Sequence, residues 1–232
     1  MNAVDAYHAA RQREGRLLAD DVVRELPFSG GRTPHPEEWR VRERSLKRVV
    51  RILHDRPRAL LEVGCGNGWL SARLAAAGHT VTGLDTGALE LEQAKRVFSD
   101  RSITWIHGDP WAAAVPAHGY DLILFAASIQ YFPDLRALLD RCQELLTDDG
   151  EVLIIDSHFY ADNASAERAR MRSVEHYASI GTPQMAAFYH HHTERAILDA
   201  AMHGRGEITP PRGRVAALLF GRSPFPVVRI RF

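Results

Sequence analysis

The chain has 232 residues, of which 45% are hydrophobic, enough for one substantial core with added segments. Lys+Arg and Asp+Glu both total 29, so the formal net charge is zero, and this excludes an overall basic footprint for nucleic acid or an anionic membrane. Cys65 and Cys142 are too few for a disulfide framework or a four-cysteine zinc site. No run approaches the ~20 apolar residues of a membrane-spanning helix, and the first residues lack the apolar core of a signal peptide. We therefore expect a cytoplasmic protein.

The segment 1–56 is highly charged and predicts an N-terminal helical cap with two helices. Apolar residues recur at helical spacing first at Leu17, Leu18, Val22 and Leu26, and again from Val41 to Leu53. Between them, PFSGGRTPHPEEW holds a Gly pair and three prolines, which predict a loop that enters the second helix.

From residue 58 short β-rich runs alternate with helix-like stretches, which predicts a Rossmann-like α/β core over 57–157. The expected strands are 58–63, 79–85, 103–108, 120–127 and 150–157. The helices between them include one that ends near Gly78. Right-handed crossovers place the carboxyl ends of all five strands at one edge, where ligands of open α/β sheets bind.

After residue 157 the alternation lapses. The segment 158–192 is polar, rich in Ala and Arg and without a strong apolar face, which predicts a helical insertion or lid. The segment 193–232 predicts a helix between the N-cap Thr193 and the C-cap Gly204, and last strands that complete the sheet. In it, RVAALLFG fits a helix or a strand, and VVRIRF alternates as a strand.

The stretch LLEVGCGNGWLS places three glycines between a strand and a helix. Gly64, Gly66 and Gly68 permit a tight turn at which backbone N–H groups approach a ligand. A dinucleotide-binding protein also places glycines here, but Glu62 near the end of the strand would repel a pyrophosphate. The pattern therefore favours a cationic ligand.

Two further carboxylates follow the next strands. Asp85 comes 21 residues after Gly64, close to the spacing at which an acidic residue reaches ribose hydroxyls. Asp109 ends the third strand, where it can accept a hydrogen bond from the amine of an adenine. No Lys or Arg stands beside these residues to hold a phosphate, so the ligand predicted is a positively charged, unphosphorylated nucleoside such as S-adenosylmethionine.

With these residues the chain resembles class I S-adenosylmethionine-dependent methyltransferases, in the group that acts mostly on small molecules. LLEVGCGNG, LD with Asp85, GD with Asp109, YDLILFAASIQYFPD and LLTDDGEVLIIDS resemble the family's motifs in order, with Asp149 in place of a family Gly. The resemblance implies a mostly parallel seven-stranded sheet with helices on both faces and an antiparallel last strand, for which VVRIRF is suited. It also implies that the segments outside the core form the acceptor pocket. The residues expected at the cofactor are Glu62, Gly64, Cys65, Gly66, Gly68, Asp85, Thr86, Gly108, Asp109, Pro110 and Phe125.

The implied reaction moves the sulfonium methyl to an O, N or C atom of a small-molecule acceptor. Because the sulfonium is already activated, the transfer needs mainly alignment and desolvation. An acceptor of high pKa would also need a base, for which the sequence offers His158, Gln130, Tyr131 and His191 after predicted strands or before the late helix. We expect no metal site, because the adjacent histidines of the run 190–192 point in different directions and lack a carboxylate at ligand spacing.

Three other functions compete with this hypothesis. A non-catalytic S-adenosylmethionine sensor or complex subunit would keep the nucleoside site and wall off the sulfonium. An NAD-dependent oxidoreductase is disfavoured by Glu62. A methyltransferase acting on RNA or protein would use the RARMRS stretch, against which the neutral net charge argues. Arg40, at the start of the second predicted helix, is expected to reach the cofactor carboxylate if that helix covers the cofactor.

Overall fold

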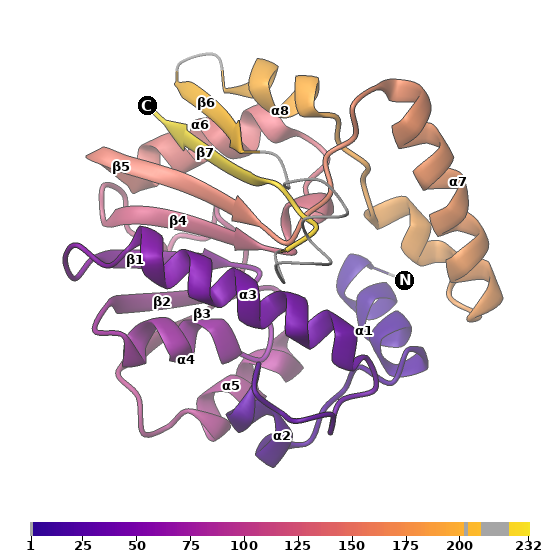
Figure 1. Ribbon diagram of the computed structural model, residues 1–232, viewed down its shortest axis with the longest axis horizontal. Helices are drawn as coiled ribbons and strands as arrows, with labels where there is room; N and C mark the ends of the chain where they lie inside the picture. The colour runs from indigo at the N-terminus through magenta and orange to yellow at the C-terminus, as the bar shows by residue number, and fades with distance from the viewer. Residues whose placement is uncertain (1, 202–203, 210–222) are drawn as a thin grey trace.

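A computed structural model describes residues 2–201, 204–209 and 223–232, and its centre is a seven-stranded sheet (Figure 1). The strands are β1 (Ala59–Val63), β2 (Thr80–Asp85), β3 (Ile103–His107), β4 (Tyr120–Ala126), β5 (Leu146–Ile155), β6 (Arg205–Thr209) and β7 (Val227–Arg231), in the order β3-β2-β1-β4-β5-β7-β6. The first five are parallel, and β7 runs antiparallel to both β5 and β6. The predicted mostly parallel sheet of seven strands and the antiparallel role of VVRIRF are confirmed.

The strands β5 and β6 differ from the sequence prediction. β6 was not predicted, because RGEIT has one apolar residue and its strand is mostly exposed. RVAALLFG lies outside the described residues. β5 begins at Leu146, four residues before the predicted start at 150, and a register shift against β4 separates its two parts.

Alternating side chains of the sheet enter two separate hydrophobic clusters. In β4, Ile123 and Phe125 pack with α6 (Leu135–Leu145) and α8 (Glu194–Ala200). Leu122 and Leu124 pack with α2 (Asp20–Glu25), α3 (Pro36–Ile52), α4 (Trp69–Ala76) and α5 (Ala88–Val97). This period-two division is what a strand covered on both sides requires, and it fixes which residues end at the ligand-binding edge.

Helix ends follow the sequence in most places. The Thr193 hydroxyl accepts the Ala196 N–H at 3.0 Å and caps α8, as predicted. Gly78 follows the C-cap of α4 with φ +96°. The prediction for Gly204 is wrong, because α8 already ends at Ala200, with Ala201 as its C-cap.

The N-terminal segment has three helices instead of the predicted two. Leu17 and Leu18 precede α2 and lie outside a helix. The first helix, α1 (Ala3–Arg13), was missed because the residues it buries are Ala6 and Ala10, which make a weak apolar stripe.

The first helix packs away from the sheet, beside α7 (Asn163–Ser179) and the short 3₁₀ helix η2 (Pro183–Phe188). Ala6 and Ala10 form a third cluster with Tyr177 and Met185, separate from the two clusters on the sheet. We call α1, α7 and η2 the cap. In Figure 1 the cap stands beyond the carboxyl ends of the parallel strands. Among the described helices, none is long and apolar enough to cross a membrane.

Candidate active site

A cavity of about 770 Å³ lies between the strand ends and the cap. Its floor includes the turn after β1 at Gly64 and Gly66, Ala127 after β4 and Asp156 after β5. Its walls come from α1, α3, α7 and the residues around η2. The cavity thus occupies the edge of the sheet at which the sequence places a ligand.

Gly64, Gly66 and Gly68, the glycines of the turn 64–68, all have positive φ but differ in what surrounds them. A Cβ on Gly64 would lie 2.5 Å from the Ser128 Cβ, and one on Gly68 would lie 2.4 Å from the Trp105 ring. A Cβ on Gly66 would meet nothing within 4 Å. Gly64 and Gly68 are therefore required by packing, whereas Gly66 keeps backbone open to the cavity.

Asp85 holds this glycine turn in place. Its carboxylate accepts the backbone N–H groups of Gly66 and Gly87, each at 2.7 Å. Burial raises the pKa of Asp85, although the two N–H groups oppose that rise. The side chain thus links the end of β2 to the one glycine that is open to the ligand.

Glu62 is a buried carboxylate beneath the same turn, with 3% of its surface exposed. The Ser71 hydroxyl donates to it at 2.5 Å, and burial together with the charge of Asp85 raises its pKa to about 8. Within the described residues it forms no ion pair, so a cationic ligand group beside it would favour its ionised form. Its neighbour Cys65 is a buried free thiol whose pKa burial raises well above the usual value, which fits a small packing residue.

Several residues predicted at the cofactor do not line this cavity, among the residues that the structure describes: Gly68, Asp85, Thr86, Gly108, Asp109, Pro110 and Phe125. Asp85 is connected to the cavity lining by the hydrogen bond that its carboxylate accepts from the Gly66 N–H. Asp109 is exposed after β3 and accepts the Trp111 N–H at 2.9 Å. Phe125 is fully buried in the core beside Phe132, so only its backbone is near the edge.

The ends of β4 and β5 carry a feature that the sequence did not predict. Ala127 and Asp156 are not glycines, yet both have left-handed φ, at +55° and +54°. The Ala127 N–H donates to the Ile155 carbonyl at 3.0 Å, so the two strained residues follow paired strands. Asp156 is 8% exposed, accepts from the Ser45 hydroxyl with one oxygen, and has no partner for the other among the described residues. Burial raises its pKa.

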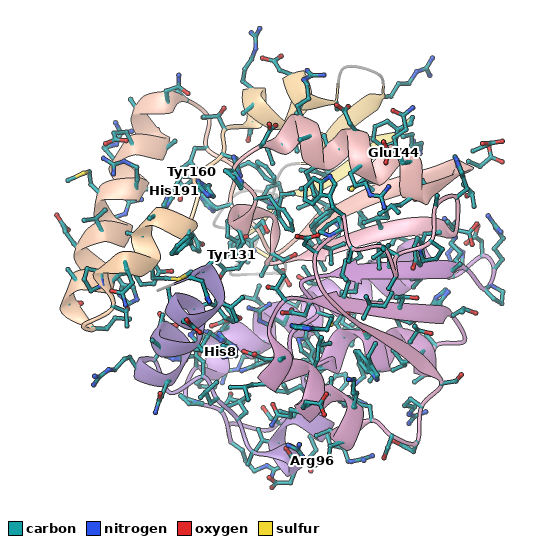
Figure 2. All side chains as sticks on the ribbon, turned by 180° about the vertical axis from the view of Figure 1, so that it is seen from behind. His8, Arg96, Tyr131, Glu144, Tyr160 and His191 are labelled. Carbon is teal, nitrogen blue, oxygen red and sulfur yellow. The ribbon has the colours of Figure 1, made fainter. Side chains whose placement is uncertain are left out.

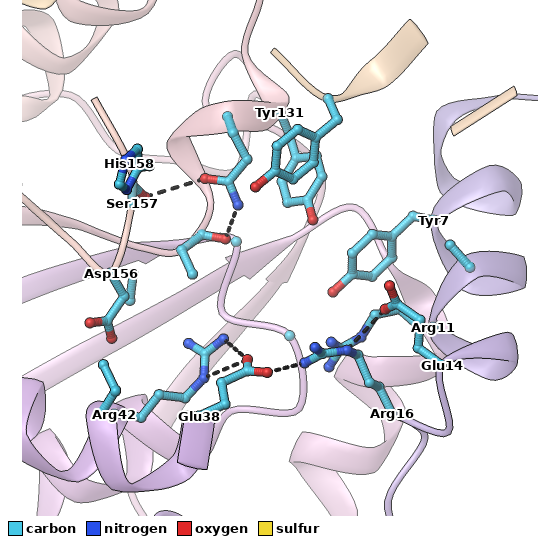
Figure 3. Close-up of a pocket in the computed structure, with 18 of the residues that line it drawn as sticks. Tyr7, Arg11, Glu14, Arg16, Glu38, Arg42, Tyr131, Asp156, Ser157 and His158 are labelled. Carbon is cyan, nitrogen blue, oxygen red and sulfur yellow. Dashed lines mark hydrogen bonds and ion pairs between the residues drawn. The ribbon is translucent and has the colours of Figure 1, made fainter. Parts of the chain in front are cut away.

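A chain of polar contacts along the cavity connects α3, the end of α1 and α7. Figure 3 shows its members Arg42, Glu38, Arg16 and Glu14. Arg42 donates to Glu38 at 2.6 Å, Glu38 also binds Arg16, Arg16 pairs with Glu14 at 2.9 Å, and Glu14 meets His176 at 2.9 Å. We call these five residues the ion-pair chain. Burial disfavours ionisation of Glu38, but the two arginines outweigh it and lower its pKa to about 2.

Arg40 does not reach this cavity. It is bound to Glu37 and lines a separate pocket of about 380 Å³, whereas Arg42, two residues later on α3, faces the cavity. The sequence prediction for Arg40 is therefore wrong by about half a helical turn, since residues two apart on a helix point in nearly opposite directions.

Aromatic rings also line the cavity, in a nearly continuous row. From Tyr7, the ring contacts run to Tyr131 at 5.5 Å, on to Tyr189 at 5.8 Å, and from there to His191 at 5.1 Å. They continue through Tyr160 and His158 to Phe225, with centroid distances of 5.7, 4.8 and 6.1 Å. We call Tyr7, Tyr131, Tyr189, His191, Tyr160, His158 and Phe225 the aromatic arc, and every member lines the cavity. Figure 2 shows Tyr131, Tyr160 and His191 between the sheet and α7.

The four predicted catalytic candidates all reach the cavity. Gln130 has both ends of its amide bound, donating to the Ala127 carbonyl at 2.6 Å and accepting from the Ser157 hydroxyl at 3.3 Å. Burial lowers the pKa of His158 and of His191 and raises that of Tyr131. These directions favour the uncharged form of all three rings at neutral pH.

The other histidines of the run 190–192 are not part of the cavity wall. The ring of His192 contacts the Phe132 carbonyl at 3.0 Å, and burial lowers its pKa to about 4. No group of His, Cys, Asp and Glu suited to a metal ion is found among the described residues.

Comparison with known proteins supports the same assignment. Residues 60–150 match the family model described as "Methyltransferase domain". An uncharacterized methyltransferase of Mycobacterium tuberculosis is 35% identical over 96 residues, which are 41% of this chain and 49% of the relative. The ubiquinone biosynthesis O-methyltransferase of Citrobacter koseri is 34% identical over 96 residues, 40% of each chain. The core of this chain, residues 60–150, is therefore similar to methyltransferase domains.

Solved structures of methyltransferases are similar to this chain in fold. A S-adenosylmethionine-dependent methyltransferase from Mesorhizobium loti matches with a TM-score of 0.60 at 18% identity, over 80% of this chain and 96% of that one. Geranyl diphosphate C-methyltransferase from Streptomyces coelicolor matches with a TM-score of 0.63 at 12% identity, over 85% and 84%. The aligned part spans half or less of the curated sequence relatives, so their activities are not transferred with the domain.

Proposed function

We propose that the protein is an S-adenosylmethionine-dependent methyltransferase that moves the sulfonium methyl to an O, N or C atom of a small-molecule acceptor. One observation carries the proposal. The open backbone at Gly66 lies between the unpaired, buried carboxylate of Glu62 and the turn-bound carboxylate of Asp85, at the floor of a cavity with room for more than one ligand.

The chemistry of this donor set fits S-adenosylmethionine. A buried acid without a cationic partner suits the ammonium of the methionine part, and Gly66 leaves room for that part to approach the backbone. We assign the ribose hydroxyls to Asp85 and the adenine to Asp109 and its neighbours Gly108 and Pro110 after β3. Glu62 also argues against a pyrophosphate, and therefore against NAD, at this turn.

The reaction requires little covalent chemistry from the protein. The C–S bond of the sulfonium breaks with its electron pair left on sulfur, and the acceptor atom forms the new bond to the methyl carbon. Alignment and exclusion of water account for up to ~7–11 kcal/mol of such a barrier when positioning is good. The cap lies beyond the carboxyl ends of the parallel strands, so it is the part of this chain suited to exclude water from the reacting atoms.

We propose that residues 57–157 bind the cofactor and 193–232 complete the sheet. Segments 1–56 and 158–192 jointly form the acceptor side, since α1 of the first packs against α7 and η2 of the second. An acceptor small enough for the cavity is supported by the names of the relatives, which include O-methyltransferases of ubiquinone biosynthesis and a geranyl diphosphate C-methyltransferase. We also propose a cytoplasmic location, supported by two free cysteines.

The test is a calorimetric titration of the protein with S-adenosylhomocysteine and, separately, with NAD. We expect one S-adenosylhomocysteine per chain and no binding of NAD. Binding of NAD alone would contradict the proposal, and binding of S-adenosylhomocysteine without room for an acceptor next to its sulfur in the complex would favour a non-catalytic sensor.

A further inference from the structure

The part of the cavity assigned to the acceptor is lined by aromatic rings and by charged residues. The aromatic arc presents seven consecutive rings to the cavity from α1, η1 (Ile129–Tyr131), the strand ends and the residues around η2. Such a wall offers ring faces and edges at the 4.5–7 Å spacing preferred by aromatic pairs. A flat, unsaturated ligand can continue the same edge-to-face packing.

Most acidic residues that line the cavity have a basic partner or a histidine partner within the protein. Glu38 is bound by Arg42 and Arg16, Glu14 by Arg16 and His176, and Glu90 by His8 at 3.1 Å. The acids close to the glycine turn, Glu62 and Asp85, are assigned to the cofactor. The acidic residues of the cavity therefore leave little unbalanced charge to bind a charged acceptor.

Three groups that line the cavity are exceptions among the described residues. Arg11 lies over the Tyr7 ring at 5.7 Å without an ion pair, and one carboxylate oxygen of Asp156 has no hydrogen-bond partner. The third is Arg172. It lies on α7, is exposed, lines the cavity and forms no ion pair within the part of the chain that the structure describes. The next residue, Ser173, contacts Nε2 of His191 at 3.0 Å, which places Arg172 beside the far part of the arc. Its charge acts together with burial to lower the pKa of His158 and of His191. Glu167, the nearby acid on α7, is bound to Arg170.

The two ends of the arc lie beside different charged groups. Tyr7 stands at the cofactor end, where burial raises its pKa, the charge of Arg11 opposes that rise, and Asp85 and Glu90 add to it. His191, Tyr160 and His158 stand at the other end, beside Arg172. A ligand that follows the arc has Arg11 and the acids Asp85 and Glu90 near its inner end, and Arg172 near its outer end.

We propose that the acceptor is a small aromatic carboxylate, whose ring packs against the aromatic arc and whose carboxylate binds Arg172. The inference rests on the proposed function, because it places the atom to be methylated at the inner end of the ligand, toward the cofactor. A cationic aromatic acceptor is disfavoured by Arg172, and an unsaturated ring is favoured over a saturated one by the run of ring contacts.

The test measures binding to protein already saturated with S-adenosylhomocysteine, by calorimetry or saturation-transfer NMR. The probes are 4-hydroxybenzoate, neutral phenol, cationic tyramine and the saturated 4-hydroxycyclohexanecarboxylate. We expect 4-hydroxybenzoate to bind best, by roughly tenfold over phenol, the low end for a charge-assisted hydrogen bond.

Arg172→Gln should remove this preference for 4-hydroxybenzoate over phenol. Arg168→Gln is the matched control, since Arg168 is exposed on the same helix and donates to Ser165 at 2.8 Å outside the cavity. Tyr189→Leu should reduce binding of both aromatic probes while leaving S-adenosylhomocysteine bound.

Preference for tyramine, equal binding of phenol and 4-hydroxybenzoate, equal binding of the saturated acid, or no binding of any probe to the loaded protein would each overturn the inference. Those results leave the proposed function intact, because S-adenosylhomocysteine is already bound in each of them. Failure of S-adenosylhomocysteine itself to bind would instead overturn the proposed function, and the inference with it.

Discussion

The floor of the cavity and its cap are built on different principles. The floor is the end of a parallel sheet whose strands are buried on both sides, and its turn is fixed by packing of Gly64 against Ser128 and of Gly68 against Trp105. The cap has a small hydrophobic cluster of its own, in which two of the four buried residues are alanines. The ion-pair chain adds contacts between α1 and α7. The proposed cofactor site is therefore part of the fold itself, whereas the proposed acceptor side depends on an added segment with a small hydrophobic cluster.

The sharpest way to separate turn packing from ligand contact is a pair of glycine variants. Gly68→Val should destabilise the protein by roughly 3 kcal/mol or more, because it adds overpacking against Trp105 to an unfavourable positive φ. Gly66→Val also has an unfavourable positive φ but meets no neighbour, so it should destabilise the protein less, leave it folded and abolish S-adenosylhomocysteine binding. Circular dichroism with calorimetry distinguishes the two. A folded Gly66→Val protein that still binds would show that the ligand does not approach this backbone.

The buried acid of the floor should make stability depend on pH. Glu62 has a folded-state pKa of about 8 and an ordinary value of 4.5, so the folded state holds more protons between these values and stability falls as the pH rises through that window. The contribution of Glu62 to the free energy of unfolding should decrease by up to about 1.4 kcal/mol per pH unit in this window. Glu62→Gln lacks this contribution, so its stability should depend less on pH. Denaturant unfolding at several pH values measures it. Identical slopes in both proteins would refute the role assigned to burial of Glu62.

At the ribose position we expect a more moderate effect. Asp85→Ala should weaken S-adenosylhomocysteine by about 1–3 kcal/mol, through lost hydrogen bonds to the ribose and a looser turn at Gly66. Asp109→Ala should cost less than about 1 kcal/mol, because a hydrogen bond to a carboxylate that is exposed to solvent contributes little. Calorimetry on both variants ranks them, and a larger effect at Asp109 would reverse the assignment of the main polar contact.

The smallest expected effect concerns the cap. Backbone amides of 158–192 should exchange faster than those of the five parallel strands and slow when S-adenosylhomocysteine is added, since the cap cluster is small. Glu14→Gln should increase exchange in α1 and α7 further, by an opening free energy of about 0.5–1 kcal/mol for partly exposed ion pairs. Glu92→Gln, which removes an exposed pair with Lys95 on α5, is the control. Strong, ligand-independent protection throughout 158–192 would mean that the cap is a rigid wall.

The same contrast explains what could be predicted from the sequence. The β1 turn, Asp85 and the antiparallel end of the sheet follow from local patterns, because a glycine turn after an apolar strand and period-two alternation depend on neighbouring residues. The cap could not be predicted from such patterns. Its helix α1 buries alanines, and the residues that α1 contacts are more than 160 positions away in the sequence, as in the contact of Glu14 with His176. Asp156 and Arg42 were missed for a similar reason. Their importance arises from where β5 and α3 end relative to the cavity, which no local spacing encodes.

The central claim is that one cavity holds the cofactor at the glycine turn and the acceptor beneath the cap. A crystal structure of the complex with S-adenosylhomocysteine tests it most directly. We expect the ribose within hydrogen-bonding distance of the Asp85 carboxylate, the ammonium on the side of Glu62, and the sulfur facing the space between Asp156 and the aromatic arc. Ligand density that does not reach the glycine turn and the cavity, or a sulfur enclosed by protein with no space toward the arc, would contradict the proposed function.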